Sequence, residues 1–209
     1  NRILVRADNR INRHIIPSQK SDFFIFGGIT RDVWLQVLNP VFIDNIRIRT
    51  PEVNAEWAET MAAVEVMHTG EVPKIHTIEG LIKNTGGEIV SRVRLKKRIK
   101  PGINDVTIEM PNIKKPDLWS PDRPHLYEFI VRLGDQPYAD QLSNRFGYRW
   151  FEFKENGPFY LNGERLLLRG THRHEEHAGY GNAMPNHLHR KDMQMIKEMG
   201  ANFVRLAHY

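Results

Sequence analysis

The chain has 209 residues, of which 40% are hydrophobic and none is cysteine, and its formal net charge is +5. That length can hold one large domain or two small ones, and the lack of cysteine excludes a disulfide scaffold and a cysteine-ligated metal. No stretch approaches the roughly 20 apolar residues that span a bilayer, so we expect no membrane partner.

The positive charge does not by itself indicate nucleic acid. Basic residues are spread among acidic ones, and the densest basic run, Arg92–Lys100, alternates with Val93, Leu95 and Ile99. Such alternation is typical of the solvent-facing side of a strand, so we expect no nucleic-acid partner.

The first 50 residues contain short apolar-alternating runs separated by turn residues. The runs are Ile3–Ala7, Val33–Leu38 and Ile43–Ile48. This pattern predicts antiparallel strands with polar outer faces.

Residues 51–146 repeat the strand pattern at a regular spacing. The predicted strands are Met61–His68, Lys74–Lys83, Glu88–Lys100, Asp105–Met110 and Leu126–Leu133. Turn residues such as the Asn84–Gly87 run separate them and allow the chain to reverse. A block of this length with this strand count predicts an immunoglobulin-like β-sandwich.

From Gly147 the pattern changes to strand, loop, helix and strand. An apolar strand at Leu166–Leu168 is followed by a helix over Leu188–Met199, which Gly200 ends, and by a strand within Asn202–Tyr209. This order predicts one βαβ unit with parallel strands. The apolar helix positions are expected to pack against the flanking strands; they are Leu188, Met195, Ile196 and Met199.

Six of the ten histidines lie between His172 and His208. His172, His174 and His208 follow predicted strand ends that point to one edge of the sheet, and Arg205 lies close to that edge. As metal ligands, His172 and His174 would indicate a metal-dependent hydrolase. As hydrogen-bond donors, these side chains would bind a hydroxyl-rich ligand. The remaining histidines considered are interpreted as structural or surface residues: His14, His68, His76, His125, His187 and His189.

Four segments, in this order, carry a resemblance to a known family. They are DFFIFGGITRDVWL (residues 22–35), LWSPDRPHLY (118–127), FGYRWFEF with LNGERLLLRGTHRHE (146–175), and NFVRLAHY (202–209). Together they resemble glycoside hydrolase family 2, and its β-galactosidases more than its β-glucuronidases. The resemblance covers the whole chain.

The resemblance implies a mainly β fold in three parts. Residues 1–50 would be the tail of a jelly-roll domain of the sugar-binding type, residues 51–146 an immunoglobulin-like β-sandwich, and residues 147–209 a βαβ piece of a TIM barrel. The implied parent is a bacterial retaining exo-β-glycosidase, most similar to a β-galactosidase, that hydrolyses terminal β-linked sugars of glycosides, oligosaccharides or polysaccharides. The resemblance is compatible with a homo-oligomeric parent that is located in the periplasm or in the cytoplasm.

The resemblance also implies roles for individual residues. His174, Arg205 and His208 match positions that bind sugar hydroxyls, and Asp22 matches an acidic residue that binds sugar and, in some members, sodium. Sodium or magnesium is therefore expected only in the intact parent. His172 stands where the family often has asparagine, so no sugar-binding role is assigned to it. Arg169, Gly170 and Arg173 are expected to shape the loop.

A retaining glycosidase needs two carboxyl groups roughly 5–5.5 Å apart. The resemblance places both glutamates beyond Tyr209, so these 209 residues are expected to be inactive alone. Glu175 and Glu176 are sequence neighbours and are expected to shape the loop or form salt bridges instead. Two alternatives remain: a carbohydrate-binding or structural β-sandwich module whose Trp57, Trp119 or Trp150 forms an exposed platform, and the metal-dependent hydrolase using His172 and His174.

Overall fold

The structure, a computed structural model, describes residues 2–10, 12–14, 24–135, 137 and 140–206. The chain forms two compact units. One unit comprises Gln36–Leu167, and the other comprises Asn1–Leu35 together with Leu168–Tyr209.

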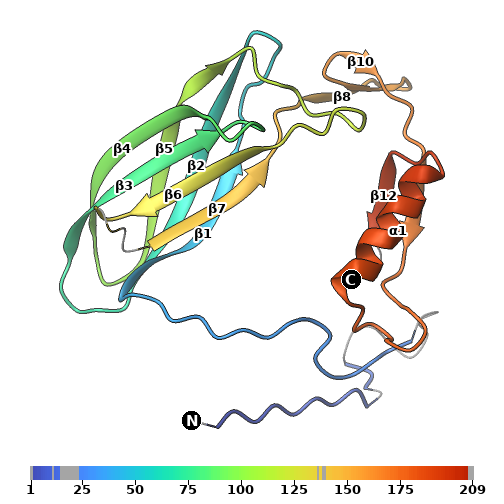
Figure 1. Ribbon diagram of the computed structural model, residues 1–209, viewed down its shortest axis with the longest axis horizontal. Coiled ribbons are helices and arrows are strands. Elements are labelled where there is room, and N and C mark those ends of the chain that lie inside the picture. Colours follow the sequence, from blue (N-terminus) through green and yellow to red (C-terminus); the bar gives the residue numbers. More distant parts are fainter. Residues whose placement is uncertain (1, 11, 15–23, 136, 138–139, 207–209) are drawn as a thin grey trace. The chain divides into compact units, whose positions relative to one another are not determined.

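The unit Gln36–Leu167 is built on two antiparallel sheets (Figure 1). The first sheet has the order β1-β2-β5, with β1 at Val41–Arg49, β2 at Trp57–His68 and β5 at Gly102–Lys114. The second has the order β4-β3-β6-β7, with β3 at Lys74–Lys83, β4 at Ile89–Ile99, β6 at Tyr127–Leu133 and β7 at Asp140–Phe146. This confirms the predicted immunoglobulin-like sandwich.

The sandwich core comes from alternate residues of the facing strands. Along β2, every second residue is buried, including Val64 and Val66, because successive side chains of a strand point to opposite faces. Ile78 of β3 and Phe129 of β6 are fully buried in the same cluster. All basic residues of β4 are exposed, and all of them except Lys97 alternate with Val93, Leu95 and Ile99 as predicted.

One strand predicted before the sandwich belongs to the sandwich in the structure, and the sandwich has one further strand that was not predicted. The predicted run Ile43–Ile48 lies within β1, which pairs with β2, so it belongs to a sandwich sheet rather than to the preceding segment. Strand β7 was missed because its sequence has only Leu142 and Phe146 as apolar members. Its pairing with β6 forms the strand despite this weak pattern.

The strands predicted at Ile3–Ala7 and Val33–Leu38 are wrong for the described residues, which have no strand there. Their apolar side chains are exposed, with Leu4 and Leu35 both at 87%. A strand needs a neighbour to accept and donate its backbone hydrogen bonds, and alternation alone does not supply one.

A third, smaller sheet follows the two sandwich sheets in the same unit. It has the order β10-β9-β8, with β8 at Phe151–Phe153, β9 at Phe159–Leu161 and β10 at Glu164–Arg165. Asn162 and Gly163 both have positive φ angles, 53° and 82°, as a tight two-residue hairpin turn requires. This hairpin clusters with the sandwich and was not predicted.

The other unit contains the predicted βαβ element. Strand β11 at Gly170–Arg173 and strand β12 at Phe203–Leu206 are parallel, and helix α1 at Asn186–Glu198 connects them. Gly200 has a φ of 88° and ends the helix as predicted. Within the described residues, no helix is both long and apolar enough to cross a bilayer.

Two local predictions about this unit are wrong. Leu166–Leu168 is not a strand; the strand begins at Gly170, where the backbone finds β12 as its partner. Met195 and Met199 are 50% and 67% exposed instead of packing against the strands. A single βαβ element covers only part of its helix, because in a barrel neighbouring elements share that role.

The sandwich should lose stability at acidic pH through His76. Burial and electrostatic interactions with His68 and Lys74 lower the pKa of His76, and its Nε2 atom has no hydrogen-bond partner among the described residues. The neutral ring is favoured in the folded state, so its stabilisation is present above the unfolded pKa of about 6.5 and is lost as the pH falls towards the lowered value.

Denaturant unfolding measured between about pH 8 and about pH 5 checks this expectation. The His76→Leu variant should show a shallower decline, by at most about 1.4 kcal/mol per pH unit, than the unchanged chain. His187→Ala, at an exposed position on α1, is the control. Identical slopes for the unchanged chain and His76→Leu would contradict the assignment.

Candidate functional site

The parallel pair β11 and β12 brings together three of the polar residues singled out in the sequence. His172 of β11 is in register with Arg205 of β12, so these two exposed side chains emerge on one face of the sheet. His174 follows β11 directly, and the rings of His172 and His174 are 6.0 Å apart. His172, His174 and Arg205 therefore form the strand-end cluster.

Two of the predicted site residues, Asp22 and His208, lie outside the described residues. The sugar-binding roles of His174 and Arg205 remain predictions. His172 is within β11 rather than after a strand end, and it is the register partner of Arg205.

Arg173 connects β11 to α1. Its guanidinium is buried, donates to Oδ2 of Asp192 at 2.6 and 2.9 Å, and donates to Nδ1 of His189 at 3.0 Å. A charged group at 7% exposure requires such partners, because an unpaired buried charge is costly. Arg173 therefore shapes the loop, and His189 has a structural role.

Glu175 is held by two arginines. It forms ion pairs with Arg31 and with Arg173, the latter at 3.6 Å. Arg31 also donates to the backbone carbonyl of Asn182 at 2.9 Å, so it joins the segment near Thr30 to the loop after β11. The expectation that Glu175 forms salt bridges is confirmed. Arg31 was missed in the sequence, although it lies within one of the quoted motifs.

The described residues contain no group of three or more histidine, cysteine, aspartate or glutamate side chains able to hold a metal. Glu176 Oε1 and Asn182 Oδ1 are buried, and neither has a hydrogen-bond partner among the residues that the structure describes. Two such oxygens fall short of the six to eight that calcium takes, and of the octahedral set that magnesium prefers. These two oxygens therefore do not by themselves make a metal site.

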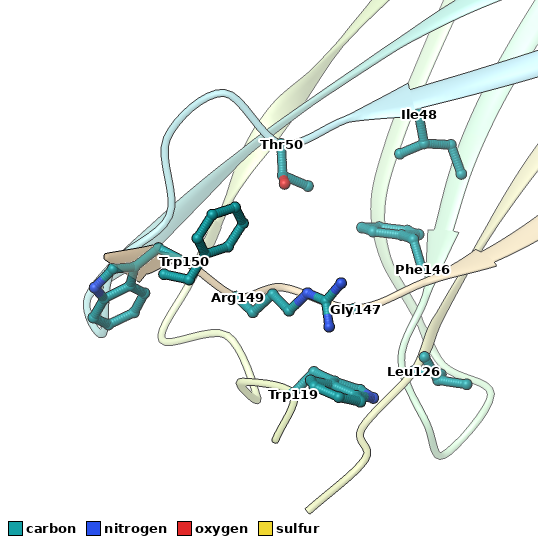
Figure 2. A pocket seen from close by; sticks show the side chains of 9 residues that line it. Ile48, Thr50, Trp119, Leu126, Phe146, Gly147, Arg149 and Trp150 are labelled. Carbon is teal, nitrogen blue, oxygen red and sulfur yellow. The ribbon is translucent and has the colours of Figure 1, made fainter. Parts of the chain in front are cut away.

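A separate cavity lies in the unit Gln36–Leu167, at one end of the sandwich (Figure 2). Its volume is about 720 Å³. Ile48 and Thr50 line it from the end of β1 and the residue beyond, and aromatic rings line other walls, among them Trp119 and Trp150. The Arg149 guanidinium lies over the Trp119 ring, 4.6 Å from its centroid.

Comparisons with known proteins agree with this architecture. Residues 41–149 match the model of glycosyl hydrolases family 2, and residues 151–209 match that family's TIM barrel domain. The first match alone covers more than half of the chain. The structure is therefore a β-sandwich followed by the start of a TIM barrel domain. The chain belongs to glycosyl hydrolase family 2.

Individual relatives match across nearly the whole chain. A putative beta-glucuronidase of Formosa agariphila is 50% identical over all of it, and a beta-galactosidase of Thermoanaerobacter pseudethanolicus is 32% identical over all of it. The crystal structure of Bacteroides uniformis beta-glucuronidase superposes with a TM-score of 0.91 at 31% identity over 97% of the chain. The chain spans 25%, 28% and 25% of these three proteins, respectively.

Proposed function

We propose that these residues are part of a retaining exo-β-glycosidase that acts on terminal β-galactosides. The observation that carries the proposal is the strand-end cluster on the parallel pair β11 and β12, in a chain of glycosyl hydrolase family 2. Active sites of such barrels lie at the carboxyl ends of the strands. Family membership favours this chemistry over the metal-dependent hydrolase alternative.

In this proposal the chain binds the sugar and other residues of the parent perform the acid–base and nucleophilic steps. His174 and Arg205 donate hydrogen bonds to hydroxyls of the non-reducing sugar, and His208 and Asp22 complete that subsite. The proposal gives Glu175 a structural role, because its carboxylate links Arg31 and Arg173. The proposal assigns both catalytic carboxyl groups to other parts of the parent, and Asp22 contributes to a sodium or magnesium site that only the intact parent completes.

Terminal β-glucuronides are the second candidate substrate. This choice is supported by the 50% identity to a protein named a putative beta-glucuronidase, against 32% identity to the beta-galactosidase. The two sugars differ at the C5 substituent, which is a hydroxymethyl group in one and a carboxylate in the other, and also in the orientation of the C4 hydroxyl. A buried cation facing the C5 substituent would favour the glucuronide.

Hydrolysis assays with matched chromogenic substrates test the proposal. The 209-residue chain should release no chromogen above background, whereas the full-length parent should cleave the β-galactoside. Faster cleavage of the β-glucuronide by the parent would transfer the assignment to the second candidate. Turnover by the 209-residue chain that is abolished in Glu175→Gln would show that the carboxylates have been misplaced.

A further inference from the structure

The cavity at the end of the sandwich contains a cation without a counter-ion. Arg149 is exposed, and among the described residues no carboxylate pairs with it. Some other arginines of this unit pair with carboxylates, such as Arg47 with Glu65 and Arg94 with Asp135. The described residues that line the cavity include no acidic side chain. The cavity is therefore suited to a ligand that carries a negative charge.

Local packing holds Arg149 in place. Trp119 donates its backbone N–H to the carbonyl of Tyr148 at 2.8 Å, which holds the tryptophan beside the segment that carries Arg149. A side chain at Gly147 would place a Cβ only 2.8 Å from Cβ of Trp119, so this close approach requires glycine. Figure 2 shows the Arg149 guanidinium above the Trp119 ring, extending into the space between Trp119 and Phe146.

The other walls are suited to a sugar ring. Trp150 and Phe151 line the cavity, and Phe151 is 60% exposed. Aromatic faces pack against the apolar faces of pyranose rings, and the volume of about 720 Å³ lies within the range of ligand pockets. The planar fork of a guanidinium binds a carboxylate through two parallel hydrogen bonds.

We propose that this cavity is a binding site for a uronic acid residue of a polysaccharide, separate from the strand-end cluster. Arg149 binds the carboxylate, and the aromatic walls contact the ring. The choice of a sugar rests on the proposed glycosidase function, whereas the requirement for an anion rests on Arg149 alone. The site would hold an acidic polysaccharide on the sandwich and would not take part in bond cleavage.

Binding of methyl β-D-glucuronide to the 209-residue chain tests the proposal. The indole N–H signals of the four tryptophans can be followed by NMR. Those of Trp119 and Trp150 should shift, and those of Trp34 and Trp57 should not. Methyl β-D-glucoside and acetate, at equal ionic strength, should each bind at least about tenfold more weakly, because each lacks one half of the interaction.

Variants of Arg149 make the test specific. Arg149→Gln should weaken glucuronide binding at least about tenfold, and Arg149→Lys, which keeps the charge but not the fork, should weaken it less. Arg145→Gln, at an exposed position on β7, is the matched control and should bind as the unchanged chain does. If Arg149→Gln does not fold, Arg149→Lys and Trp150→Ala still decide the question.

Three results would overturn the proposal. Equal affinity for glucoside and glucuronide would show that Arg149 does not bind the carboxylate. Equal affinity for acetate and glucuronide would show that the sugar ring is not recognised. Unshifted Trp119 and Trp150 signals would show that the ligand does not bind in this cavity. These measurements do not involve hydrolysis. Their failure would therefore leave the glycosidase proposal standing, and failure of the parent to cleave glycosides would leave a positive binding result standing.

Discussion

Replacing His174 with alanine in the full-length enzyme should lower kcat/KM by roughly 10- to 1,000-fold. The reason is that a hydrogen bond to a sugar hydroxyl strengthens as the ring flattens towards the oxocarbenium-like transition state, so its loss raises the barrier. Arg205→Ala should cause a loss of similar size, because water does not replace the fixed donor geometry of a guanidinium. Steady-state kinetics on the preferred chromogenic glycoside provide the measurement.

The appropriate control for this prediction is His187→Ala, which should change kcat/KM by less than about threefold. His187 is exposed on α1, whereas His189 contacts Arg173 and would perturb the loop if removed. An unchanged rate in both His174→Ala and Arg205→Ala would show that the strand-end cluster does not bind the substrate. A loss of equal size in His187→Ala, with the fold intact, would do the same.

The second large effect concerns the stability of the sandwich. Tyr148 is fully buried in the core, where its ring packs edge-on against Tyr127 and Phe146 at centroid distances of 4.8 and 5.0 Å. Its hydroxyl forms a hydrogen bond with that of Thr60. Tyr148→Ala should therefore lower the free energy of unfolding by about 3–5 kcal/mol, the usual result of leaving a cavity in place of a large aromatic side chain.

Tyr148→Phe separates the hydrogen bond from the packing. It should cost about 1–3 kcal/mol, because the buried hydroxyl of Thr60 loses its partner while the ring remains. Burial raises the pKa of Tyr148 to about 12, so the unchanged chain should also lose stability as the pH rises from about 10, the unfolded value, to about 12. That alkaline loss should be smaller in Tyr148→Phe.

Denaturant unfolding monitored through the amides of β2 and β6 provides the measurement. Ile75→Ala, at a position that is 71% exposed, should change stability by no more than about 0.5 kcal/mol. Tyr148→Ala with a stability equal to that of Ile75→Ala would exclude Tyr148 from the cooperative core.

Much of the sandwich could be read from local patterns. Strand β3 has the predicted bounds, Lys74–Lys83, because apolar alternation and the turn residues that follow it are properties of neighbouring residues. Helix α1 was predicted for the same reason, with Gly200 ending it. The family resemblance came from residue order in four motifs and needed no coordinates.

The candidate site was only partly predictable. The positions of His174 and Arg205 pointed to one edge of a sheet, and the structure pairs β12, which carries Arg205, with β11, which His174 directly follows. Arg31 could not be assigned to Glu175 from sequence, because 144 residues separate them. Likewise, nothing local indicates that Arg149 lies over Trp119.

By itself, the sequence determined the family, the sandwich, the helix and the identity of the polar residues near the two strands of the βαβ element. Only the tertiary structure decided that the strand begins at Gly170 rather than Leu166, that Ile43–Ile48 joins the sandwich, and that Glu175 is held by Arg31 and Arg173. The reason is physical: periodicity and turn preference act between neighbouring residues, whereas strand pairing and ion pairs depend on partners that folding brings from distant parts of the chain.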